Sequence, residues 1–120
     1  MKEIKAYIRQ IKAEEVIHAL EEAGVPGLAI IEVKAIGKEV EGEKTRFSID
    51  YAEKVCSTVK IEVVCRDEDS ERLASIISKA AHTGQRGDGM IFVSDVAEAV
   101  KIRTGESGES ALLPTDKKEG

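Results

Sequence analysis

The chain contains the same order of elements twice, and this order predicts its fold. In the first half, apolar and polar residues alternate over 2–8, which is typical of a strand with one buried face. Apolar residues three and four positions apart over 13–23 predict an amphipathic helix, which Gly24 would end in a left-handed conformation. The run 28–36, rich in Ile and Val, predicts the second strand of this unit.

The second half follows the same pattern. Residues 55–65 alternate as a strand, and the acids at 67–69 stand where a helix dipole favours them, before an apolar helical stripe over 73–80. A strand at 90–95 and a helical turn at 96–100 are predicted next. Two such units predict an α+β chain with the ferredoxin-like βαββαβ fold, a four-stranded antiparallel sheet with two helices on one face.

Length and charge narrow the class of protein. A chain of 120 residues is long enough for one core, so we expect one domain over 1–105 and a polar tail over 106–120. A net charge of −5 and only four aromatic residues argue against a nucleic-acid partner, which needs a basic face or stacking rings. Since no apolar run approaches the length of a membrane span and the N-terminus lacks a signal-peptide pattern, we expect a cytoplasmic protein with no membrane insertion.

The predicted sheet has apolar residues on both of its faces. Helices cover one face, while Tyr7, Val64 and the run 91–93 suggest that the other face also needs a cover. A second copy of the chain is a natural cover, and cyclic symmetry is the usual form of such an assembly.

The segment 38–54 carries many charges and few apolar residues, so it cannot bury much surface. Loops of this length in a small domain are usually functional. Phe47, Ile49 and Tyr51 alternate within it, and they either extend a hairpin or present a contact patch to a partner protein. Tyr51 is also a candidate modification site.

The segment 83–89 reads Thr-Gly-Gln-Arg-Gly-Asp-Gly and joins the second helix to the last strand. Glycine accepts positive φ, so such a run can turn successive amide N–H groups inward. Inward amides form a concave nest that suits a phosphate. The alternative is a tight helix-to-strand turn with no ligand.

These residues resemble those of the P-II signalling family over essentially the whole chain. The segment 83–89 with Ile-Phe-Val at 91–93, and Ile-Arg-Thr-Gly-Glu at 102–106, look like the B-loop and C-loop of that family. Val-Lys-Ile-Glu at 59–62 and the strand that ends at Gly37 are also similar.

The resemblance implies a homotrimer that binds ATP or ADP in clefts between subunits. It further implies that the long segment 38–54, like the T-loop of the family, docks on a target protein, such as a transporter or an enzyme. Lys38 and Lys101 stand where the family usually has Arg, which keeps the charge but loses the bidentate geometry. The residues that correspond to the nucleotide site are Gly37, Lys38, Val64, Gly87, Asp88, Gly89, Lys101 and Arg103.

Several positions depart from the family pattern. Met90 replaces a Lys, which removes one phosphate cation and costs on the order of 2 kcal/mol. In the family, a Gln and a Lys help to bind 2-oxoglutarate, and this chain has Glu39 and Thr58 at those positions. We therefore expect 2-oxoglutarate to bind poorly or not at all. We also expect ADP or AMP to rival ATP as the ligand. The residues do not decide whether Mg²⁺ accompanies the nucleotide. Tyr51 falls at the uridylylation position of the family, but Ser-Ile-Asp precedes it where the family has a different pattern.

Two other functions compete with that of a nucleotide sensor. No nucleophile–base pair is evident, so we predict no enzyme; weak nucleotide hydrolysis would have to use His82. A variant tied to metal or solute transport, with the related CutA-like architecture, would have only Cys56, Cys65 and His82 as metal ligands. The cysteine spacing fits neither a zinc motif nor a disulfide framework, so we expect free thiols and assign no metal site. The usual setting of the family is nitrogen control, through an ammonium transporter or the control of glutamine synthetase.

Overall fold

The computed structural model describes residues 1–36, 38–41, 44–47 and 57–113. Gly37, Tyr51 and Cys56 lie outside these residues. The strands are β1 (Lys2–Arg9), β2 (Ala29–Lys34), β3 (Lys38–Glu41), β4 (Lys44–Phe47), β5 (Ser57–Cys65) and β6 (Gly89–Asp95). The helices are α1 (Ala13–Glu22) and α3 (Asp67–Ala81), with short 3-10 turns η1 (Gln10–Lys12) and η2 (Glu109–Leu112).

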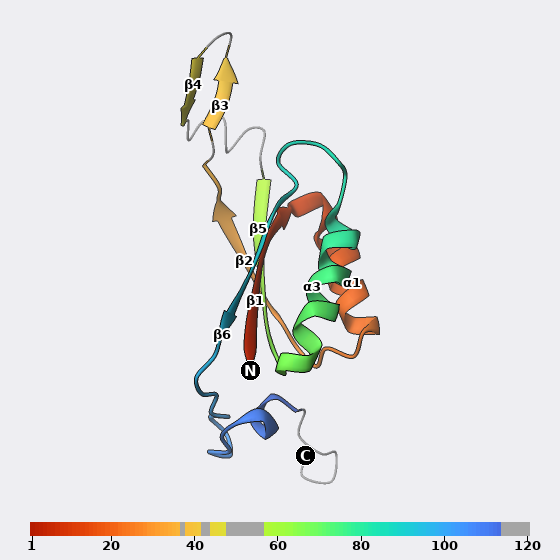
Figure 1. The fold of residues 1–120 in the computed structure, drawn as a ribbon, viewed down its shortest axis with the longest axis vertical. Helices are drawn as coiled ribbons and strands as arrows, with labels where there is room; N and C mark the ends of the chain where they lie inside the picture. The colour runs from red at the N-terminus through yellow and green to blue at the C-terminus, as the bar shows by residue number, and fades with distance from the viewer. Residues whose placement is uncertain (37, 42–43, 48–56, 114–120) are drawn as a thin grey trace.

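Four strands form one sheet in the order β2-β5-β1-β6, and every neighbouring pair is antiparallel. Figure 1 shows α1 and α3 side by side on one face of this sheet. The predicted ferredoxin-like arrangement is therefore confirmed. None of the helices in the described part of the chain is long and apolar enough to cross a membrane.

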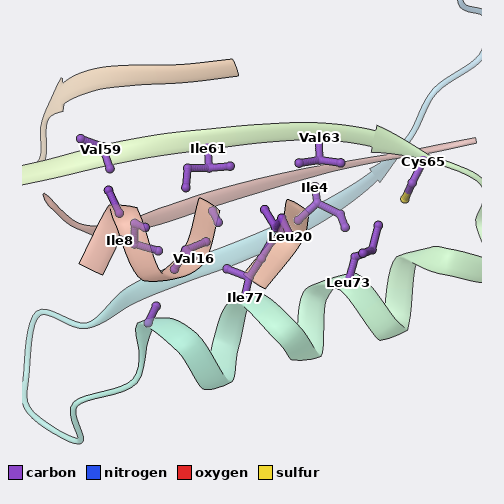
Figure 2. Close-up of a cluster of buried hydrophobic side chains, with 13 residues drawn as sticks. Ile4, Ile8, Val16, Leu20, Val59, Ile61, Val63, Cys65, Leu73 and Ile77 are labelled. Carbon is purple, nitrogen blue, oxygen red and sulfur yellow. The ribbon is translucent and has the colours of Figure 1, made fainter. Parts of the chain in front are cut away.

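The core lies between the sheet and the two helices (Figure 2). Alternate residues of β1 and β5 are buried, as the period of two predicts for strands with one covered face. The helices supply apolar residues three and four positions apart, which share one helical face. The larger side chains of this cluster are Ile4, Ile8, Val16, Leu20, Val59, Ile61, Val63, Leu73 and Ile77.

The predicted end of α1 at Gly24 is confirmed. Gly24 has a φ of 90°, and the Val25 amide donates to the Leu20 carbonyl oxygen at 3.1 Å. This bond satisfies a carbonyl that the helix would otherwise leave unpaired.

Of the two alternatives for the segment 38–54, the hairpin is present in its described part, where β3 and β4 pair as antiparallel strands.

One sequence prediction needs correction. The helical turn predicted at 96–100 is absent. The Val96 amide instead donates to the Met1 carbonyl oxygen at 3.0 Å, and Val100 forms an isolated bridge with Ser107. Beside this bridge, the Gly108 amide donates to the Ala99 carbonyl oxygen at 3.0 Å. The partners of Val96 and Ala99 thus lie outside the segment, and these backbone groups are paired without a helix.

The sheet face away from the helices carries both aromatic and charged side chains. Tyr7 and Phe92 pack edge to face with ring centroids 6.0 Å apart, and the Lys60 ammonium lies 5.9 Å from the centroid of the Tyr7 ring. Lys60 also pairs with Glu62 at 3.1 Å. Of the apolar run 91–93, only Phe92 faces this side, since its neighbours are in register with buried residues of β1.

Candidate functional site

Asp88 organises the glycine-rich loop between α3 and β6. Its carboxylate accepts hydrogen bonds from the amides of Thr83 and Gly84, each at 2.8 Å, and from the Thr83 hydroxyl. These bonds join the last residues of the loop to the first. They stabilise the charged form, so the Thr83 hydroxyl, the Thr83 and Gly84 amides and then the Arg9 guanidinium hold the pKa of Asp88 well below its usual range.

Arg9, the last residue of β1, binds the same loop from outside. Its Nε donates to Asp88 at 3.1 Å, and its terminal nitrogen donates to the Arg86 carbonyl oxygen. The Arg9 and Asp88 side chains are only 22% and 23% exposed. The loop is thus tied both to itself and to the central strand of the sheet.

The glycines of the loop adopt the positive φ that the sequence predicts. Gly84, Gly87 and Gly89 have φ values of 87°, 95° and 105°. A Cβ on Gly89 would lie 1.7 Å from the Tyr7 carbonyl oxygen, so only glycine fits where the loop enters β6. The strand predicted after the loop is present as β6, and it anchors the loop to the sheet through the register of Gly89 with Ile8.

A hollow of about 260 Å³ lies beside the loop. Its wall includes Tyr7, His82 and Asp88, together with Met90, whose side chain is exposed. His82 follows the last residue of α3 and lies near Gly84: a Cβ placed on that glycine would be 3.6 Å from the His82 ring.

The basic residues Lys101 and Arg103 belong to a separate turn near the C-terminal end of the described chain. The Lys101 ammonium donates to the Leu113 carbonyl oxygen at 2.9 Å and lies 3.8 Å from the Glu106 carboxylate. The Gly105 amide donates to the Lys101 carbonyl oxygen at 2.8 Å, which closes the turn. Arg103 is exposed on this turn.

The predicted site residues within the described ranges fall into two groups at opposite ends of the sheet (Figure 1). On β1, Ile8 is in register with Gly89 and Glu3 is in register with Val64. These two positions are five residues apart along β1, which is about 17 Å. Figure 1 shows the glycine-rich loop and the β3–β4 hairpin, which begins at Lys38, beyond one end, and the C-terminal turn with η2 beyond the other.

Comparison with known proteins decides the family. The family model described as "Nitrogen regulatory protein P-II" matches residues 1–106. The chain belongs to the P-II family.

Curated P-II relatives match this chain over nearly their whole length. "Nitrogen regulatory protein P-II 2" of Methanothermobacter thermautotrophicus is 46% identical over 112 residues, which cover 93% of this chain and 97% of the relative. "Nitrogen regulatory protein P-II" of Rhizobium meliloti is 41% identical, and that of Azospirillum brasilense is 43% identical, each over 93% of this chain and the whole relative. The resemblance drawn from the loop motifs is therefore confirmed, and this P-II chain is a signalling regulator and not an enzyme.

The two candidate metal ligands that the structure describes, Cys65 and His82, do not lie together. Within the described ranges, no group of three His, Cys, Asp or Glu side chains is placed to hold a metal ion. Cys65 is a buried free thiol, as predicted, and burial raises its pKa. His82 lies at the other end of α3, where the loop begins.

The contact of Arg9 with the loop is the feature of the site that the sequence does not predict. Arg9 stands 79 positions from Asp88, and nothing in its own neighbourhood marks it as a loop residue. The contact can be inferred only from the pairing of β1 with β6, because that pairing brings the end of β1 to the start of β6.

Proposed function

We propose that this P-II chain senses adenine nucleotides in clefts between the subunits of a homotrimer. The observation that carries the proposal is the separation of the two groups of site residues. Gly87 and Gly89 lie at one end of the sheet, while Val64, Lys101 and Arg103 belong to the other. A nucleotide that contacts both groups needs the loop of one protomer and the basic turn of another.

The glycine-rich loop supplies a fitting phosphate site in this proposal. Asp88 and Arg9 hold the loop in one shape, so amide donors are in place before the ligand arrives. The cations of Lys38, Lys101 and Arg103 would add charge-assisted hydrogen bonds to a polyphosphate.

The open face of the sheet supports assembly into a trimer. Phe92 and Met90 on β6 are more than half exposed, and Ile31 on the opposite edge strand is more than one-third exposed. A neighbouring sheet or loop of the same chain would bury these side chains, which favours association.

The proposed output is regulation of a target protein through the segment 38–54. Figure 1 shows the described part of this segment, the β3–β4 hairpin, projecting beyond the end of the sheet. A projecting hairpin can contact a partner without disturbing the core. The family description favours a target in nitrogen regulation, and the replacement of the 2-oxoglutarate residues by Glu39 and Thr58 keeps a target in another transport process as the alternative.

The test is calorimetric titration of the purified protein with ATP, ADP and AMP, each with and without Mg²⁺ and 2-oxoglutarate. The proposal expects one nucleotide site per protomer, no more than weak 2-oxoglutarate binding, and a sedimentation mass three times the 13.0 kDa protomer. A monomer that binds no adenine nucleotide at millimolar concentration would overturn the proposal. Tight, ATP-dependent binding of 2-oxoglutarate would overturn the part that concerns Glu39 and Thr58.

A further inference from the structure

We propose that Arg9 is a positioning residue that fixes the orientation of the Gly87 amide and thereby sets the affinity for polyphosphate. The inference rests on the proposed nucleotide site and adds to it a residue outside the glycine-rich loop.

Arg9 makes two different contacts with the loop. Its Nε binds the Asp88 carboxylate at 3.1 Å, and its terminal nitrogen binds the Arg86 carbonyl oxygen. An arginine can make both contacts because its guanidinium presents several donors in a fixed planar fork. Arg9 is also the last residue of a central strand, so the fork is held from a rigid element.

The contact with Arg86 determines where the next amide points. The Arg86 carbonyl and the Gly87 N–H belong to one planar peptide unit, and the described chain has no cis peptide. In a trans peptide the C=O and the N–H point in opposite directions. Because the carbonyl points toward Arg9, the Gly87 N–H points away from Arg9.

Gly87 is the residue at which this orientation needs support. With a φ of 95° and no side chain, Gly87 can rotate its flanking peptides at little cost. If the Arg86–Gly87 peptide rotated, a carbonyl oxygen would replace the N–H at the place where a phosphate is proposed to bind. The bond from Arg9 opposes that rotation.

Arg9 also offsets the charge of Asp88. A carboxylate in an anion site would repel a phosphate, but the Arg9 guanidinium lies directly against it. Arg9 also lies close to Gly87, since one of its terminal nitrogens would be 3.2 Å from a Cβ built on that glycine.

The test compares Arg9→Gln and Arg9→Lys with wild type. Lysine is a point charge that can pair with Asp88 but cannot reproduce the planar fork. Arg66→Lys is the matched control, since Arg66 Nε binds Asp69 at 3.1 Å, the same distance, at a site outside the loop. Titration with ATP should give about a tenfold loss of affinity for Arg9→Gln, a smaller loss for Arg9→Lys and none for Arg66→Lys.

A second measurement needs no ligand. In ¹⁵N–¹H spectra of the unliganded protein, the Gly87 cross peak should shift or broaden in Arg9→Gln, whereas the Gly24 cross peak should stay in place. A Gly87 peak that is unchanged in Arg9→Gln, or an ATP affinity within twofold of wild type, would overturn the inference. If wild type itself binds no nucleotide, the proposed function fails, and the Gly87 spectrum still decides whether Arg9 orients the peptide.

Discussion

Gly89 lies so close to Tyr7 that a Cβ at position 89 would be 1.7 Å from the Tyr7 carbonyl oxygen. Gly89 is the first residue of β6, and its φ of 105° is one that residues with side chains rarely adopt. The close approach is between two backbones, so a small side-chain movement cannot relieve it. This contact fixes the end of the glycine-rich loop against the central strand.

Replacing Gly89 by Ala should therefore destabilise the protein strongly. We expect a loss in the free energy of unfolding on the order of 3 kcal/mol, because steric overlap adds to the cost of positive φ. Gly24→Ala is the matched control: Gly24 has a similar φ of 90°, but nothing lies within 4 Å of its Cβ position. That variant should lose only about 1 kcal/mol. Urea unfolding measures both values, and equal losses would show that the contact with Tyr7 does not matter.

The stabilising effect of Asp88 should depend on pH. The pKa of Asp88 is lower in the folded protein than its ordinary value, so protonation favours the unfolded chain. The contribution is complete above the unfolded pKa, about 4, and declines as the pH falls below it toward the folded value. Asp88→Asn should thus be less stable than wild type at pH 7, and the difference should shrink below about pH 4.

Urea unfolding of wild type and Asp88→Asn at a series of pH values checks this expectation. Glu98→Gln, a change at an exposed carboxyl group outside the loop, is the control and should show little difference from wild type at any pH. A stability difference for Asp88→Asn that stays constant from neutral to acidic pH would contradict the assigned hydrogen bonds.

Restoring a cation at position 90 should tighten nucleotide binding. Met90 follows the last glycine of the loop and is 59% exposed, so a lysine fits there without burial of charge. A new charge-assisted bond to phosphate should raise the ATP affinity of Met90→Lys by about tenfold. Met90→Leu should bind as wild type does. Equal affinities for all three proteins in calorimetry would mean that position 90 does not face the phosphates.

The sequence alone predicted the structural features that depend on neighbouring residues in the chain. The alternation of Ile4, Ala6 and Ile8 predicted a strand with one buried face, and Gly24 predicted the end of α1; both were correct. The helical turn predicted at 96–100 was wrong, because Val96 and Ala99 bond to the backbone of Met1 and Gly108, which lie outside that segment.

In the candidate site, too, local features could be predicted from the sequence, while contacts between distant residues could not. The glycine pattern predicted the positive φ values, and the strand predicted at 90–95 is present as β6; both are local properties of the chain. The contact of Arg9 with Asp88 depends on the pairing of β1 with β6, and the separation of Val64 from Gly87 depends on strand register. Neither property can be read from spacing along the chain.

In the proposed trimer each nucleotide contacts the loop of one protomer and the basic turn of another, and mixed assemblies can test this shared site. One variant, Gly87→Asp, places a carboxylate in the loop at a positive φ that Asp tolerates better than most residues. The other, Lys101→Gln with Arg103→Gln, removes the cations of the turn. Each variant alone should bind ATP weakly.

The decisive measurement is the number of ATP sites after an equimolar mixture of the two variants is unfolded and refolded together. In a trimer with random assembly, about one quarter of the clefts combine an intact loop with an intact turn, so we expect about one quarter of the wild-type sites at wild-type affinity. A mixture that binds no more ATP than the separate variants would show that one protomer supplies the whole site, and would rule out a site shared between protomers.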